Sequence, residues 1–150
     1  MGSEMCIRDR EHGALDISFN TISAYGENAA LCHYHAVPEH CASLQARGLY
    51  LVDSGGQYYE GTTDITRTIA LGPVTDEKKE HYTLVLMSML RLGHVKFLEG
   101  CSGLSLDYVA RAPFWKRGLD FNHGTGHGVG YLLNVHERPI GIRYLSLIHI

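Results

Sequence analysis

Two aspartates lie in a stretch whose other residues favour β-structure. Asp53 follows Leu-Tyr-Leu-Val and Asp64 precedes Ile-Thr-Arg-Thr-Ile, although Asp is depleted in strands. Two carboxylates on facing strands repel each other unless one takes a proton or both bind a cation. One divalent ion, or a pair of ions about 3.5–4 Å apart, would resolve that conflict. The alternative is that one aspartate caps a turn while the other pairs with Arg67.

A β-hairpin is expected to position these two carboxylates. Residues 49–59 and 64–71 are rich in Leu, Val, Ile, Tyr and Thr, which predicts two strands. The segment 60–63 supplies turn residues between them, and Gly61 could adopt a positive φ. Such a hairpin would set the two aspartates opposite each other, about 4.5–5.5 Å apart at Cβ.

Two histidines stand in a glycine-rich stretch further along. His123 and His127 lie within residues 120–130, where four glycines argue against a helix by about 1 kcal/mol each. In an extended chain the two rings would face the same side, about 13 Å apart at roughly 3.3 Å per residue. A single ion cannot reach both, so one histidine is expected to be a ligand and the other to meet substrate. The alternative for either one is a turn histidine without such a role.

Composition excludes several functional classes. The formal net charge of −3 leaves no basic surface for nucleic acid or an anionic membrane. No apolar run approaches the roughly 20 residues that span a bilayer, and no secretory signal is present at the start. The four cysteines form no C-x-x-C pair, which indicates free thiols in a reducing compartment. A chain of 150 residues suits one domain.

The remaining elements are expected to carry these segments. Two helices are predicted, over residues 76–97 and 106–116, with Thr75 and Ser105 as N-caps. In the first, an apolar stripe is expected at Tyr82, Leu86, Met89 and Leu90. In the second, Pro113 should kink or shorten the helix, and Gly118 suits the C′ position. Further strands are expected at residues 16–22, 29–35 and 131–135.

Both ends of the chain look foreign to the rest. Residues 1–10 and 144–150 fit no neighbouring element and resemble translated sequencing-adapter read-through. The alternative is an ordinary frayed tail. We therefore expect the native part to be residues 11–143 and to be a fragment.

Three motifs together resemble the metallopeptidases of the pita-bread fold, family M24. They are Leu-Val-Asp-Ser-Gly around Asp53, Asp-Ile-Thr-Arg-Thr at Asp64, and His-Gly-Thr-Gly-His-Gly-Val-Gly with His127, followed by Val-His-Glu. The resemblance is strongest to the Xaa-Pro aminopeptidase group and covers nearly all of residues 19–139. It implies an α+β fold with a curved antiparallel sheet and helices on one face, present here in part.

The resemblance also implies a two-metal site, usually manganese. Asp53 would bind one ion, Asp64 would bridge both, and His127 would bind the other. A water or hydroxide between the ions would attack the carbonyl of the first residue of a peptide. By the same likeness, His33 lies on the rim of the substrate pocket, His123 approaches the scissile peptide, and His136 hydrogen-bonds substrate or product.

The implied activity is release of the N-terminal residue from peptides with proline second, by a cytoplasmic enzyme that is dimeric at full length. The family completes its site with two glutamates further downstream, which this sequence does not reach, so the fragment alone is expected to be inactive. Two alternatives stay open, a prolidase-type dipeptidase and a non-catalytic module that binds peptides or proteins. Retention of the three predicted ligands favours an enzyme.

Overall fold

The protein is described by a computed structural model over residues 13–144, which divide into two units. Unit 1 comprises the chain up to Val74 together with Val129–Glu137, and unit 2 comprises Thr75–Gly128 and the chain from Arg138 onward. Of the two segments expected to be foreign, residues 1–10 and 144–150, all but Tyr144 lie outside the described part. No described helix is long and apolar enough to cross a membrane.

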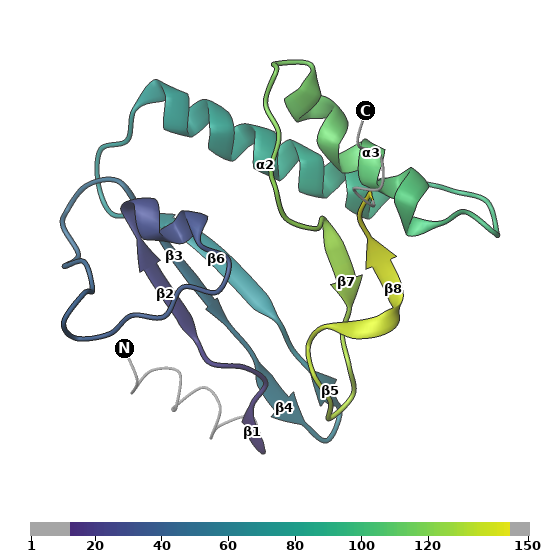
Figure 1. The fold of residues 1–150 in the computed structure, drawn as a ribbon, viewed down its shortest axis with the longest axis horizontal. Helices are drawn as coiled ribbons and strands as arrows, with labels where there is room; N and C mark the ends of the chain where they lie inside the picture. Colours follow the sequence, from purple (N-terminus) through teal and green to yellow (C-terminus); the bar gives the residue numbers. More distant parts are fainter. Residues whose placement is uncertain (1–12, 145–150) are drawn as a thin grey trace. The chain divides into compact units, whose positions relative to one another are not determined.

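An antiparallel three-stranded sheet organises unit 1 (Figure 1). Strand β3 (Leu49–Ser54) lies between β2 (Ile22–Tyr25) and β6 (Ile65–Ala70). The alternation of Leu, Tyr and Val in β3 suits a central strand. Tyr50 is buried there, and its hydroxyl hydrogen-bonds Ser23 at 2.9 Å.

The predicted hairpin is confirmed, but its turn is tighter than expected. Strands β4 (Gly56–Tyr58) and β5 (Gly61–Thr62) extend β3 and β6. Strand β4 pairs with β5 on one side and with β1 (Asp16–Ile17) on the other, which makes a second sheet. Since Tyr58 pairs with Gly61, only Tyr59 and Glu60 form the turn. Gly61 lies in a strand and does not adopt positive φ, contrary to expectation.

Three other strand predictions were wrong in whole or in part. Residues 16–22 divide between β1 and β2, which lie in different sheets. Residues 29–35 form no strand, because Gly26 at φ 61° turns the chain into the short 3₁₀ helix η1 (Gly26–Ala30). Residues 131–135 also form no strand, because Gly130 donates to the carbonyl of Asn134 and closes a loop.

Two packed helices and a two-stranded sheet form unit 2. Helix α2 (Asp76–His94) is N-capped by Thr75, as predicted, and ends three residues earlier than expected. Helix α3 (Gly103–Trp115) starts after Ser102 instead of Ser105 and continues through Pro113. Gly118, at φ 67°, ends it as predicted: Gly118 and Leu119 donate to the carbonyls of Trp115 and Phe114.

The apolar stripe predicted for α2 is not its packed face. The four predicted residues are all exposed, and the buried positions are Leu84 and Ser88. Ser88 donates its hydroxyl to the carbonyl of Ala110 in α3. The helices therefore pack closely through a small residue, which a count of large apolar residues does not detect. Strands β7 (Gly126–Gly128) and β8 (Glu137–Ile142) form the small sheet.

Candidate metal centre

Asp53 carries a buried carboxylate oxygen that lacks a partner. The residue lies near the end of β3, paired with Ile22 on one side and Thr66 on the other. Its Oδ1 atom is buried and has no hydrogen-bond partner among the described residues. An unsatisfied buried acceptor costs about 1–3 kcal/mol, and more when charged. A carboxylate in this condition fits a cation-binding position.

Asp64 is not directly opposite Asp53, so that expectation was wrong. Asp53 pairs with Thr66, and Asp64 lies two residues earlier, just before β6 begins. This offset corresponds to the diagonal spacing of a sheet, about 7–8 Å between Cα atoms. The offset leaves more room between the carboxylates than direct pairing would, which suits bridged or adjacent ions better than a shared proton.

The backbone beside Asp64 depends on a glycine. Gly55 breaks the strand between β3 and β4, and a Cβ atom there would lie 1.9 Å from the carbonyl oxygen of Thr63. Ser18 donates its hydroxyl to the same carbonyl at 2.7 Å. The close approach at Gly55 therefore fixes the backbone that carries Asp64.

Within unit 1, Asp64 lies beside His136. A carboxylate oxygen of Asp64 and a ring nitrogen of His136 lie within 4.8 Å of each other. Carboxylate oxygen and imidazole nitrogen are both common ligands of divalent transition metals. The sequence assigned His136 only to substrate, whereas the structure also gives it a position from which it could reach an ion held by Asp64.

The hairpin tip holds the loop that precedes His136. Thr62 Oγ1 accepts a hydrogen bond from the backbone N–H of Leu132 at 3.0 Å. Gln57 Nε2 donates to the carbonyl of Leu133 at 2.8 Å. Leu132 adopts φ 51°, an uncommon value for a β-carbon-bearing residue. These contacts fix the loop against β4 and β5 and thereby bring His136 toward Asp64.

His33 also lies close to His136. Their ring centroids are 6.4 Å apart with an interplanar angle of 42°, and both side chains belong to exposed residues. Two of the three histidines that the resemblance places around a substrate are thus neighbours in unit 1.

In unit 2, His127 and His123 lie on the glycine-rich segment. His127 is in β7, and its Nδ1 lies 3.0 Å from the carbonyl oxygen of Gly128. A proton on Nδ1 donated to that carbonyl makes Nε2 the atom that can bind a metal. His123 has the same arrangement, with Nδ1 at 2.7 Å from the carbonyl oxygen of Gly124.

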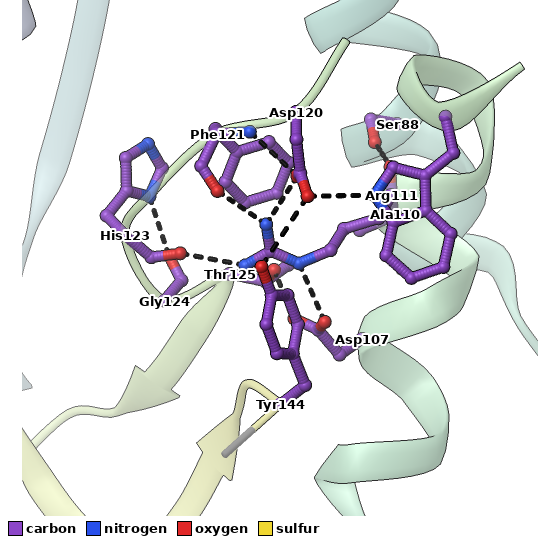
Figure 2. A network of polar contacts seen from close by, with 11 residues as sticks. Ser88, Asp107, Ala110, Arg111, Asp120, Phe121, His123, Gly124, Thr125 and Tyr144 are labelled. Atoms are coloured by element: carbon purple, nitrogen blue, oxygen red, sulfur yellow. Dashed lines mark hydrogen bonds and ion pairs between the residues drawn. The ribbon is translucent and has the colours of Figure 1, made fainter. Parts of the chain in front are cut away.

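Arg111 organises the segment around His123 (Figure 2). It is 2% exposed and forms a 2.7 Å ion pair with Asp107, which is 1% exposed. It also pairs with Asp120 at 2.7 Å and donates to the carbonyls of Phe121 and His123. This network was not predicted from the sequence, although Asp107 and Arg111 have the i,i+4 spacing of a helical ion pair.

Both charges of the ion pair between Arg111 and Asp120 are stabilised. Burial opposes the charge of Arg111, but hydrogen bonds and charges of Asp120 and Asp107 outweigh it and raise the pKa of the guanidinium. Desolvation opposes the charge of Asp120, but hydrogen bonds from Trp115, the Phe121 amide and Arg111 lower the pKa of that carboxyl below its usual value. Arg111 and Asp120 are therefore both charged throughout the neutral range.

The chain matches the model of metallopeptidase family M24 over residues 3–147. Among curated relatives, the probable Xaa-Pro aminopeptidase P of Paracoccidioides brasiliensis (strain Pb03) is 49% identical over 136 residues, which are 91% of this chain and 22% of the relative. The protein of the same description from Tuber melanosporum (strain Mel28) shows the same identity and coverage. The chain thus spans about a fifth of the length of these relatives.

Solved structures show the same likeness. An X-prolyl aminopeptidase from Caenorhabditis elegans, described as a cytosolic enzyme with a di-nuclear active site, superposes with a TM-score of 0.87 at 45% identity, over 93% of this chain and 23% of that one. A prolidase from Thermococcus sibiricus gives 0.76 at 32% identity, over 89% and 35%. The predicted pita-bread fold, present in part, is confirmed, and the chain belongs to metallopeptidase family M24.

Proposed function

We propose that this chain is the part of a metal-dependent Xaa-Pro aminopeptidase that supplies three of its metal ligands. The observation that carries the proposal is the buried Oδ1 of Asp53, which has no hydrogen-bond partner among the described residues. A structural aspartate would be expected to have a donor at this depth. Asp64 and His136 add two ligand-type atoms within 4.8 Å of each other.

In this proposal Asp53, Asp64 and His127 hold two divalent ions, and manganese is the expected metal. When bound, the ions would acidify a water molecule and polarise the peptide carbonyl. The chain's own residues would orient the substrate: His33 would lie on the rim of its pocket, His136 would hydrogen-bond substrate or product, and His123 would approach the peptide to be cleaved. The di-nuclear site described for the C. elegans relative supports two ions.

The proposed substrates are peptides with proline at the second position, and the whole protein is proposed to be a cytoplasmic homodimer. Residues 11–143 would be the family's part of this chain. The 49% identity to the Paracoccidioides brasiliensis relative and the 45% identity to the C. elegans structure, which are described as Xaa-Pro or X-prolyl aminopeptidases, support this specificity.

The test uses the full-length protein that carries this sequence. Release of the first residue from an Xaa-Pro peptide of three or more residues is measured after chelation, and again after addition of Mn²⁺. We expect activity only with the ion. Cleavage confined to Xaa-Pro dipeptides would support the prolidase alternative. No cleavage in either case, under metal-replete conditions, would favour the non-catalytic module.

A further inference from the structure

The backbone carbonyl groups of Phe121 and His123 are hydrogen-bonded by a side chain and not by a strand or helix. Residues 120–125 belong to no regular element. Arg111 donates from Nη1 to the carbonyl of Phe121 at 2.6 Å and from Nη2 to the carbonyl of His123 at 2.8 Å (Figure 2). Both bonds are part-buried, and backbone carbonyl groups that are shielded from water need such partners. The backbone on both sides of Asn122 is therefore tied to one guanidinium group.

The ring of His123 is also held in a column of planar groups. The Cζ atom of Arg111 lies 3.9 Å from the centroid of the Phe121 ring. The Phe121 and His123 rings are stacked, with centroids 4.9 Å apart and an interplanar angle of 30°. Because a guanidinium is attracted to an aromatic face, the position of Arg111 determines the position of Phe121, and that in turn limits the tilt of the imidazole.

Asp107 fixes Arg111 from the other side. Its Oδ2 accepts from Arg111 Nε at 2.7 Å, and its Oδ1 accepts from the hydroxyl of Thr125 at 2.5 Å. Both oxygens of a nearly inaccessible carboxylate are thus used, one on the guanidinium and one on the segment that follows His123. The same two helical residues therefore hold the segment at residues 121, 123 and 125.

We infer that Arg111 is a positioning residue for substrate, acting through the backbone and ring of His123. This inference rests on the proposed function, in which His123 meets the scissile peptide. Arginine is required because its rigid fork sends donors in separate directions, to Asp107, to Asp120 and to two carbonyls. The ammonium group of a lysine is a single point with three donors and cannot span these groups.

The test is Arg111→Lys in the full-length, metal-loaded protein. We expect kcat for an Xaa-Pro peptide to fall by about 10- to 100-fold, the scale of a misplaced catalytic contact, while KM and metal content per chain stay within about threefold of the original. The matched control is Arg117→Lys, whose ion pair with Glu80 is half exposed and lies outside this network. The kcat of Arg117→Lys should equal that of the unmutated protein.

A double-mutant cycle separates positioning from general destabilisation. In a His123→Ala background, Arg111→Lys should change kcat by less than about twofold, because the group through which it acts is gone. Independent, multiplicative losses would overturn the inference. If Arg111→Lys does not fold, Phe121→Leu replaces it: this variant keeps the guanidinium bonds to the carbonyls and removes the ring stack, and the same loss of kcat is expected.

A readout without activity keeps the two proposals distinct. The imidazole C–H resonances of His123, measured by NMR at one fixed pH, should shift in Arg111→Lys and in Phe121→Leu and stay unchanged in Arg117→Lys. Absence of peptide hydrolysis by the unmutated protein would defeat the proposed function alone, since the resonances still report on positioning. Unchanged resonances in the two network variants would defeat the positioning role.

Discussion

The backbone N–H of Leu132 donates to Oγ1 of Thr62 at 3.0 Å, although 70 positions separate the two residues. Thr62 lies in β5 at the tip of the hairpin, and Leu132 lies in the loop before His136. The Thr62 hydroxyl thus connects strand β5, which precedes Asp64, with the loop that precedes His136.

Thr62→Val should release the loop without unfolding the chain. The substitution keeps the shape of the side chain and removes both the acceptor for Leu132 and the donor to Gln57 Oε1, each of which should cost about 1 kcal/mol. We expect the amide hydrogen of Leu132 to exchange several-fold faster. As a control, Thr83→Val removes a hydroxyl that bonds only within α2, to the carbonyl of Lys79. That variant should leave the exchange at Leu132 unchanged; equal exchange rates in both variants would contradict the prediction.

Gly55→Ala should be strongly destabilising, whereas Gly61→Ala should be tolerated. A Cβ at position 55 would lie 1.9 Å from the carbonyl oxygen of Thr63, which is backbone and cannot rotate away. Overpacking of this kind costs about 1–3 kcal/mol or more. At position 61 a Cβ would meet no atom within 4 Å. Urea denaturation of both variants measures the difference, and comparable midpoints would show that the backbone near Asp64 is not constrained by Gly55.

Asp53→Asn should leave the metal-free protein as stable or more stable, and should remove the stability that the protein gains from Mn²⁺. In the metal-free chain the substitution removes a charge from a position where none of residues 13–144 donates to Oδ1, so Tm should stay the same or rise. With Mn²⁺ in excess the unmutated protein should gain stability, by about 2.7 kcal/mol at 100 times Kd, and the variant should not. Asp76→Asn, an exposed substitution on α2, serves as the control and should retain the full Mn²⁺ effect.

Asp64→Asn should abolish turnover in the full-length protein. An amide cannot supply the negative charge that two adjacent cations require, so we expect kcat to fall by about 10³-fold or more, in the range lost when a metal site is disrupted. Bound Mn²⁺ per chain, measured by elemental analysis, should fall in parallel. Full activity with normal metal content would remove Asp64 from the site.

Acid should weaken unit 2 through Asp120. The folded state lowers the pKa of this carboxyl below its ordinary value of 3.8. Its contribution to stability is therefore complete above the ordinary pKa and is lost as the pH falls from about 4 through the lower, folded-state pKa. Asp120→Asn should be less stable than the original near neutral pH, and the two should converge in strong acid. Thermal melts between pH 2 and pH 7 test this, and parallel curves would contradict it.

The local pattern of residues by itself determined several elements of this protein. The β3–β6 hairpin, the Thr75 cap of α2 and the glycine that ends α3 all follow from neighbours along the chain, because turn chemistry, caps and strand propensity act over a few residues. The motifs around Asp53, Asp64 and His127 likewise indicated the family, which the match to metallopeptidase family M24 confirms.

Only the tertiary structure decided the register and the long-range partners. A sheet can shift by two residues and keep the same side chains on the same face, so the residue pattern could not tell whether Asp53 faces Asp64 or Thr66. The neighbours Asp64 and His136, and the bonds from Arg111 to the backbone at Phe121 and His123, join segments whose spacing in the chain carries no periodic signal. Such contacts depend on how the chain folds back on itself, which local propensity does not determine.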